Sequence, residues 1–193
     1  GRNIALRPEQ TASIVRAYAE HRPSLPWKVW YSGPNFRYER AQKGRFRQFD
    51  QVGIEALGAD DPYLDVEVIA IAWRFYEALG LKQVNLSLNS VGTLQNRIVY
   101  IEALSEYLET QKGFLSTEAQ ETLSSNPLRV LDSKRAEDIE VISQAPSILE
   151  HLSEEASNHF SKVEEGIKKL EIPYLVQPNL VRGLDYYVQT TFE

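Results

Sequence analysis

Two strand-like segments joined by a short basic loop constrain the fold of this chain more than any other feature. Residues 27–37 and 47–56 are rich in aromatic and β-branched residues, which favours strands, and strands this close in sequence pair as an antiparallel hairpin. Residues 37–47 carry one anion, Glu39, against five cations, in a chain whose formal net charge is -6. The cations are Arg37, Arg40, Lys43, Arg45 and Arg47. Such a local reversal of sign indicates a site for a phosphate-bearing ligand.

Side-chain alternation places polar residues of this hairpin on one face. Arg47, Gln51 and Glu55 share a face, because successive side chains of a strand point to opposite sides. A register that opposes Arg37 to Arg47 adds Arg37 to the same face. The arginine end is suited to an anion, and the Gln51 and Glu55 end is suited to an ammonium or amide-like group. We therefore expect a ligand that carries charge of both signs.

Solvated cross-strand pairs on an exposed sheet are the alternative interpretation of these charges. Gly33, Pro34 and Gly53 interrupt the two segments. Such residues weaken a strand as a scaffold, but glycine allows a ligand to approach the backbone closely. The interruptions therefore favour a binding site.

The composition is that of a globular protein without disulfides. The 193 residues are 42% hydrophobic and 25% charged. The sequence pI of about 5.2 argues against general nucleic-acid binding, although it permits a basic patch that touches one RNA end. There is no cysteine, and the three histidines lack metal-ligand spacing, so we expect no metal site.

Segments for targeting or for crossing a membrane are not recognisable. No run approaches the ~20 apolar residues of a membrane span, and no signal peptide is evident. We therefore expect a cytoplasmic protein with no membrane partner. The chain has no methionine and its ends fall within patterned segments, so we expect it to be a piece of a longer protein.

Helical and strand-like periods follow one another without a regular βαβ rhythm. One helix is predicted to open at Pro8 and to run to His21, and another is predicted from Asp61-Pro62 to Gly80. Further helices are predicted over 94–110, 117–123, 136–142 and 153–170, and further strands over 84–88, 174–176 and 186–192. This order predicts an α+β fold, with an antiparallel or mixed sheet flanked by helices and an all-helical insertion.

Charge separates a middle module from the rest of the chain. Residues 101–171 contain 15 acidic and 7 basic residues, a net of -8, which leaves 14 basic and 12 acidic residues elsewhere, a net of +2. We therefore predict a core part over 1–92, a helical insertion over 93–171 and a return to the core over 172–193. An acidic helical module for protein interaction is a further interpretation of the middle segment.

Two shorter clusters lie outside the hairpin. LRPEQT at residues 6–11 places Glu9 at a helix start, where backbone donors attract a carboxylate. LVRGLDYY at residues 180–187 places Arg182 before a glycine and then two adjacent tyrosines, Tyr186 and Tyr187. Taken singly, the first cluster predicts a capped helix, and the second predicts a turn that leads into an edge strand.

Taken together, the clusters are similar to the motifs of the histidyl-tRNA synthetases, a family of class II aminoacyl-tRNA synthetases. The matching segments are LRPEQT, GPNFRYERAQKGRFRQFDQVGIE at residues 33–55, NPLRVLDSK at residues 126–134, and LVRGLDYY. The resemblance extends over essentially the whole chain and corresponds to an interior part of the catalytic domain. It implies a class II synthetase-type sheet.

The resemblance implies a binding site for histidine. In this family the glutamate and threonine that match Glu9 and Thr11 contact chiefly the α-amino group of the substrate. Tyr187 is expected to hydrogen-bond the imidazole, with Tyr186 beside it. The complete expected histidine site consists of Glu9, Gln10, Thr11, Arg37, Gln51, Glu55, Arg182, Tyr186 and Tyr187.

The resemblance also implies two catalytic arginines, Arg37 and Arg182, on opposite sides of the ATP α-phosphate. Arg182 takes a place where related enzymes rely on a metal ion. Within the ATP site, Glu39 is expected on the adenine side and Arg45 at the outer phosphates. The loop cations expected near tRNA phosphates are Arg40, Lys43 and Arg47.

The implied activity is that of a histidine–tRNA ligase. ATP, accompanied by Mg²⁺, would activate histidine as an adenylate, and histidine would then pass to the 3′ end of tRNA(His). The implied assembly is a homodimer formed through parts largely outside this chain. The alternative is the synthetase-like, histidine-sensing regulatory subunit of ATP phosphoribosyltransferase, which lacks aminoacylation. The QKGR loop and the pair Arg37 and Arg182 favour the ligase.

The sequence departs from the family pattern in several places. Gln10 replaces a common glycine, and Val188-Gln189 replaces a more usual polar or basic pair. The dimer-forming motif 1, the motif 3 arginine and the anticodon-binding domain have no counterpart in this chain. We therefore do not expect the chain alone to be fully active.

Overall fold

The computed structural model describes residues 4–40, 42–181 and 187–193, which fall into two compact units. The first unit spans Gly1–Asp60 and the second spans Asp61–Glu193. Each unit has its own sheet, and each is described by itself. Among the described residues, no helix has both the length and the apolar character needed to cross a membrane.

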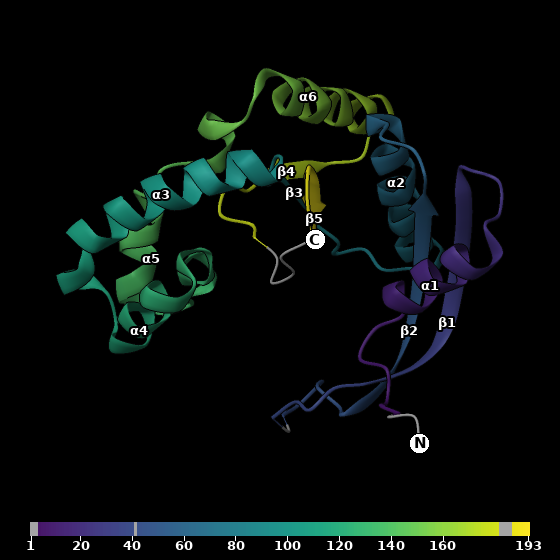
Figure 1. The fold of residues 1–193 in the computed structure, drawn as a ribbon, viewed down its shortest axis with the longest axis horizontal. Helices are drawn as coiled ribbons and strands as arrows, with labels where there is room; N and C mark the ends of the chain where they lie inside the picture. Colours follow the sequence, from purple (N-terminus) through teal and green to yellow (C-terminus); the bar gives the residue numbers. More distant parts are fainter. Residues whose placement is uncertain (1–3, 41, 182–186) are drawn as a thin grey trace. The chain divides into compact units, whose positions relative to one another are not determined.

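The first unit is a long hairpin with one helix beside it (Figure 1). Strand β1 (Trp27–Phe36) pairs antiparallel with β2 (Gln48–Leu57), from Trp27 opposite Leu57 to Phe36 opposite Gln48. The next step of this register places Arg37 opposite Arg47, where the Arg37 N–H donates to the Arg47 carbonyl at 2.9 Å. The predicted hairpin and its register are therefore confirmed. The start at Trp27 agrees with the prediction, and the other three strand borders differ from it by one residue.

Helix α1 (Thr11–His21) begins three residues after the predicted start, so the prediction that Pro8 opens it is wrong. Residues before the helix instead run along β1. The Phe36 N–H donates to the Arg7 carbonyl at 2.9 Å, and the Arg7 Nε donates to the Pro34 carbonyl at 2.8 Å. This pairing with the hairpin replaces the helical hydrogen bonds that Pro8 would otherwise have begun.

The second unit contains a mixed three-stranded sheet. Its central strand is β3 (Leu86–Ser90), which pairs in parallel with β4 (Tyr174–Val176) and antiparallel with β5 (Thr190–Phe192). The mixed sheet agrees with the predicted fold class. Strand β3 begins two residues later than predicted because its ladder is defined by its partners, from Leu86 opposite Tyr174 to Ser90 opposite Thr190.

Two helices pack on this sheet around one apolar core. Helix α2 (Pro62–Ala78) begins as predicted, with the Asp61 carboxylate accepting from the Tyr63 N–H at 2.9 Å. Helix α6 (Glu154–Lys169) packs against α2 (Figure 1). The buried core consists of Val66, Ile69, Ala70, Leu86, Leu88, Phe160, Val163, Ile167 and Ile172.

A second core lies among the helices of the middle segment, which are α3 (Leu94–Thr110), η1 (Lys112–Phe114), α4 (Thr117–Ser125), η2 (Pro127–Asp132), α5 (Ala136–Ser143) and η3 (Ile148–His151). Tyr100, Leu104 and Leu108 of α3 are fully buried at its centre. The predicted all-helical character of this segment is confirmed. The division into 1–92, 93–171 and 172–193 stays a prediction, and α6 shares its core with α2 and β3.

A buried carboxylate joins two helices of the middle segment. Asp138, in the first turn of α5, accepts from the Ser116 N–H and Oγ at 2.8 Å each and from the Ser133 Oγ at 2.6 Å. The Ser116 Oγ in turn caps α4 by accepting from the Ala119 N–H. Burial by itself raises the pKa of Asp138, but the hydrogen bonds from Ser133 and Ser116 outweigh it and hold that pKa below its usual value.

We expect Asp138→Asn to lower the free energy of unfolding by about 2 kcal/mol at neutral pH, because hydrogen bonds to a charged acceptor are lost. The folded-state pKa of Asp138 is lowered, so its contribution is complete above the unfolded value of about 3.9 and disappears as the pH falls through the folded value. Urea denaturation from pH 7 to pH 3 measures this. The exposed Glu140→Gln on the same helix is the control, and an equal loss in both variants would contradict the assignment.

The helix crossing of α2 and α6 depends on Gly166. A Cβ at this position would lie 2.6 Å from Cγ2 of Val66, which is stiff because it is β-branched. Alanine gains about 1 kcal/mol in helix propensity, but overpacking costs about 1 to 3 kcal/mol. We expect Gly166→Ala to destabilise the chain by about 1 kcal/mol in urea denaturation.

Two further variants test this explanation. Gly113→Ala, where a Cβ meets nothing within 4 Å, should not lower the free energy of unfolding. In a Val66→Ala background, Gly166→Ala should no longer destabilise, because the clashing methyl groups are gone. An undiminished loss in that background would show that the contact with Val66 is not the cause.

Candidate functional site

One face of the hairpin collects the polar groups of the first unit. Residues opposed across an antiparallel pair share a face, so Tyr31 opposite Gly53 and Gly33 opposite Gln51 lie on the same side as Glu55. Each of the two glycines removes a side chain from this face. A hypothetical Cβ on Gly53 would lie 2.2 Å from the Tyr31 hydroxyl, so glycine is required for Tyr31 to lie across the strand.

A chain of hydrogen bonds crosses this face. The Asn35 Nδ2 donates to the Gln51 Oε1 at 2.9 Å, and the Gln51 Nε2 donates to the Tyr31 hydroxyl at 3.2 Å. Asn35 is fully buried, whereas Gln51 and Tyr31 are half-buried. The carboxamide predicted as a binding group is therefore held at both of its ends.

Acidic groups lie at the end of the face nearest α1. The Thr11 Oγ1 donates to the Glu55 Oε1 at 2.5 Å, and both Glu9 oxygens accept from the Ala12 N–H, at 3.1 and 3.3 Å. The predicted attraction of Glu9 to the helix start is confirmed. Glu9, Thr11, Gln51 and Glu55, which are far apart in sequence, are thus brought together by the first unit.

The electrostatics of this end favour a cation. Burial raises the pKa of Glu55, the hydrogen bond from Thr11 opposes this, and the charge of Glu9 adds to the increase. Burial also raises the pKa of Tyr31, followed by repulsion from Glu55 and Glu9. Both shifts have the direction expected where burial and nearby negative charge disfavour a further negative charge. A bound ammonium group would relieve that repulsion.

Arg37 lies at the loop end of the same face. Its Nε donates to the Pro8 carbonyl at 2.8 Å, and its guanidinium carbon lies 5.0 Å from the centre of the Phe49 ring. Four residues, about 13 Å of strand, separate Arg37 from Gly33, which opposes Gln51. An exposed cation and a half-buried acidic cluster therefore mark the two ends of one surface.

Arg47 has different contacts from those expected for the shared face. Its guanidinium carbon lies 4.4 Å from the centre of the Tyr38 ring, and its Nε donates to the Glu39 carbonyl at 3.4 Å. Arg45 forms an ion pair with the Glu39 carboxylate at 3.5 Å. The predicted grouping of Arg47 with Arg37, Gln51 and Glu55 therefore stays a prediction, and the contacts of the Arg47 guanidinium are with Tyr38 and Glu39.

Exposed cations extend along the loop that follows β1. Arg40, Lys43 and Arg45 are all exposed, and a bridge between Gln42 and Arg45 closes the loop. Gly44 supports this turn with a φ of 81°, a backbone conformation that favours glycine. The loop therefore presents its positive charge to solvent.

Gln10 is buried, with 6% of its surface exposed, and its Nε2 lies 3.5 Å from the Gly33 carbonyl. It is also the N-cap residue of α1, and its carbonyl accepts from the Ser13 and Ile14 N–H groups. Its side chain thus packs over the hairpin backbone. The departure from glycine at this position adds a contact between α1 and β1.

The LVRGLDYY motif belongs to the second unit, and most of its functional residues lie outside the described part of the chain. Arg182 and Tyr186 are among these. Tyr187 is exposed, and its carbonyl accepts from Arg97 of α3 at 3.0 Å. Gln189 has a φ of 57°, and its backbone pairs with Val91 and Gly92.

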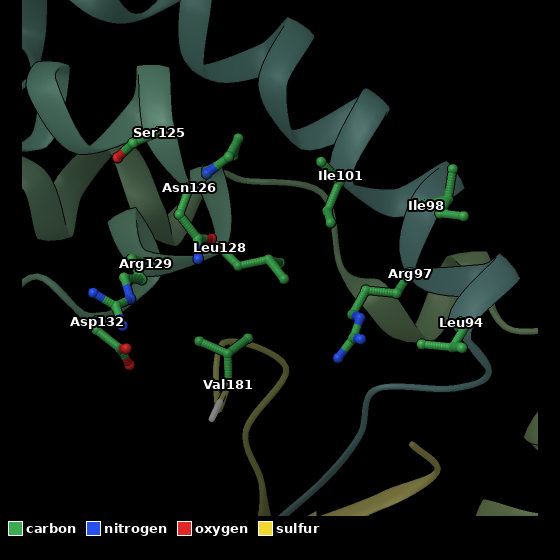
Figure 2. A pocket seen from close by; sticks show the side chains of 11 residues that line it. Leu94, Arg97, Ile98, Ile101, Ser125, Asn126, Leu128, Arg129, Asp132 and Val181 are labelled. Carbon is green, nitrogen blue, oxygen red and sulfur yellow. The ribbon is translucent and has the colours of Figure 1, made fainter. Parts of the chain in front are cut away.

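A cavity of about 500 Å³ lies between α3 and η2 within the second unit (Figure 2). Its lining includes Ile98 and Arg97 on one side, Leu128 and Arg129 from the NPLRVLDSK segment on the other, and Val181 of the LVRGLDYY motif. The two sequence motifs of this unit therefore meet at one cavity.

Two residues of the hairpin face were not singled out from the sequence. Tyr31 and Asn35 alternate with Gly33 on β1, so the same period of two that selected Gln51 and Glu55 could have found them. Among residues 4–40, 42–181 and 187–193, no group of three or more metal-ligating side chains comes together.

Comparisons with a family model and with curated proteins identify the same family. A family model described as "Histidyl-tRNA synthetase" matches residues 1–193. The chain is 49% identical over 197 residues to the histidine–tRNA ligase of Geobacillus kaustophilus, a match that covers 100% of this chain and 46% of that protein. The chain therefore spans slightly less than half the length of this curated relative.

Solved structures are also similar to the chain. Apo histidyl-tRNA synthetase from S. aureus has a TM-score of 0.71 and 39% sequence identity, over 97% of this chain and 44% of that one. A Bacillus halodurans protein described as an ATP phosphoribosyltransferase regulatory subunit/histidyl-tRNA synthetase has a TM-score of 0.63 and 24% identity, over 97% of this chain and 53% of that one. At this lower identity the similarity concerns the fold alone.

We expect Glu55→Gln to stabilise the first unit at neutral pH. The folded-state pKa of Glu55 is raised, so its charge reduces stability as the pH rises through that value, and no reduction remains below the unfolded value of about 4.3. Hydrogen exchange of the β1 and β2 amides measures this from pH 4 to pH 8. Glu20→Gln, at an exposed position of α1, is the control. Faster exchange in Glu55→Gln than in the parent at pH 7 would contradict the expectation.

Proposed function

The chain belongs to the histidyl-tRNA synthetase family, and we propose that the protein containing it is a histidine–tRNA ligase. This chain would contribute part of the catalytic domain. The proposed substrates are histidine, ATP and tRNA(His). The protein would act in the cytoplasm as a homodimer formed through parts largely outside this chain, and Mg²⁺ would arrive with ATP.

One observation carries this proposal, namely the acidic cluster and the arginine on one hairpin face. Glu9, Thr11 and Glu55 offer oxygen atoms to an ammonium group, and the raised pKa of Glu55 reflects burial and the charge of Glu9. Arg37 offers a guanidinium at the other end. An amino acid condensed with a phosphate has charges in this order, which supports an aminoacyl adenylate as the intermediate.

In the proposed first step, an oxygen of the histidine carboxylate attacks the α-phosphorus of ATP. The carboxylate oxygen forms a bond to the α-phosphorus. The bond from the α-phosphorus to the oxygen that bridges it to the β-phosphorus breaks, and pyrophosphate leaves with the bonding electrons. Both reactants are anionic, so Arg37 and Arg182 would act by positioning them and by stabilising the charge that develops on the phosphoryl oxygens. No protein nucleophile takes part.

In the proposed second step, a ribose hydroxyl at the 3′ end of tRNA attacks the carbonyl carbon of the adenylate. An ester bond to the ribose forms, the bond to the phosphate oxygen breaks, and AMP leaves as the hydroxyl proton is released. The exposed loop cations Arg40, Lys43 and Arg47 are suited to neighbouring tRNA phosphates, and we propose that role for them. Glu39 and Arg45, paired at 3.5 Å, are proposed to face the ATP.

The histidine-sensing regulatory subunit is the second candidate, since it would share the acidic end of the hairpin face. A sensor has no need of an exposed cationic loop beside that face, whereas a ligase must bind ATP and an RNA end. Arg37, Arg40 and Lys43 are exposed next to the histidine-site residues, which supports the ligase.

Two variants of the full-length protein separate the proposed roles. In histidine-dependent exchange of pyrophosphate into ATP, Arg182→Ala should reduce kcat by about 100-fold or more, the scale of one lost transition-state contact, while histidine binding survives. Glu9→Gln should raise the KM for histidine by about tenfold, because a hydrogen bond to a charged group is weakened. Exchange kinetics and calorimetric titration of histidine measure both.

Matched surface variants serve as controls for these measurements. Arg74→Ala on α2 and Glu20→Gln on α1 remove the same kinds of charge at exposed positions and should leave exchange unchanged. Full activity of Arg182→Ala would refute its catalytic role. A histidine KM unaltered by Glu9→Gln would refute the assignment of the acidic end to the amino group.

A further inference from the structure

The buried amide of Asn35 stands at the start of the hydrogen-bond chain on the hairpin face. It is fully buried in β1, opposite Phe49, and its Nδ2 donates to Gln51 at 2.9 Å. The Gln51 Nε2 in turn donates to the Tyr31 hydroxyl at 3.2 Å. Since Gln51 is one of the residues proposed to bind histidine, Asn35 reaches the substrate only through a neighbour.

The orientation of the Asn35 amide follows from which of its polar atoms is left without a hydrogen-bond partner. The Asn35 Oδ1 is buried and accepts no hydrogen bond from the described residues. If the amide were turned round, the oxygen would face Gln51 and an NH₂ group with two donors would be left in the same buried place. Buried donors without a partner are rarer in proteins than incompletely satisfied carbonyl oxygens. The observed orientation of the Asn35 amide is therefore the less costly one, because it leaves a carbonyl oxygen and not an NH₂ group without a partner.

The orientation of Asn35 and Gln51 determines which hydrogen bonds the Tyr31 hydroxyl can make. Its oxygen accepts from Gln51, so its proton is available to an acceptor on the acidic side. Thr11 also interacts with Tyr31, and the Thr11 hydroxyl donates to the Glu55 Oε1 at 2.5 Å. Gln51 is therefore fixed as an acceptor from Asn35 and a donor to Tyr31, and the charge of Glu55 acts on the Tyr31 hydroxyl.

We propose that Asn35 is a positioning residue for the amino-acid pocket, which fixes the orientation of the Gln51 carboxamide and thereby holds the Tyr31 hydroxyl as an acceptor from Gln51. The inference rests on the proposed function, since it takes Gln51 and Glu55 as groups that bind histidine. Its consequence is that Gln51 presents its carboxamide to the substrate in one fixed orientation, on the same face as the pair of Thr11 and Glu55.

Asn35→Leu in the full-length protein tests this, because leucine fills a similar volume and removes the donor. We expect the KM for histidine in pyrophosphate exchange to rise about tenfold, the size of one misdirected hydrogen bond, while kcat and the KM for ATP stay within about twofold. Ser32→Ala, at an exposed position on the other face of β1, should change none of these. An unchanged histidine KM, or an equal rise for both substrates, would overturn the proposal.

A double-mutant cycle distinguishes positioning from general damage. If Asn35 acts through Gln51, the histidine KM of Asn35→Leu/Gln51→Ala should equal that of Gln51→Ala alone. Independent effects that multiply would refute the proposal. Asn35→Asp keeps the shape but accepts where asparagine donates, so it should weaken histidine binding even if the leucine variant folds poorly. Retained affinity in Asn35→Asp would likewise refute it.

The wild-type measurement separates this inference from the proposed function. Absence of histidine-dependent exchange in the wild-type protein would refute the ligase and not the role of Asn35. Wild-type exchange accompanied by an unaltered Asn35→Leu variant would refute the role of Asn35 and leave the ligase in place.

Discussion

The antiparallel register of β1 and β2 is the constraint on which the candidate site depends. It opposes Gly33 to Gln51 and Tyr31 to Gly53, and so selects which side chains share a face. A shift by one residue would send Gln51 and Glu55 to the other side of the sheet. The segment before α1 hydrogen-bonds to β1, through the Arg7 contacts with the chain at Pro34 and Phe36.

Much of this arrangement could be predicted from the sequence, because it depends on local periodicity. The period of two grouped Gln51 with Glu55, and the Asp61-Pro62 signal located the start of α2. The start of α1 was missed, since the backbone of the preceding residues pairs with a strand distant in sequence. Such tertiary pairing overrides a local proline signal and leaves no trace in the sequence pattern.

Contacts of long side chains were the least predictable part of the site. Arg47 shares strand parity with Gln51, yet its guanidinium stacks on Tyr38 and reaches the Glu39 carbonyl. An arginine head lies several bonds from its backbone, so strand parity determines only where its stem begins. Strand parity could have placed Asn35 on the same face, but it does not predict the hydrogen bond from its buried Nδ2 to Gln51, which depends on packing.

Because Gly53 has no side chain, the two faces of the hairpin differ in how well they tolerate substitution. On the ligand side, even one added carbon would displace the Tyr31 ring and disconnect Gln51 from the acidic end. On the reverse side, Trp30 and Val52 are 72% and 56% exposed, so larger side chains at these positions can extend into solvent. Sequence drift in this hairpin should therefore be confined to alternate positions, so that restricted and variable residues alternate along each strand.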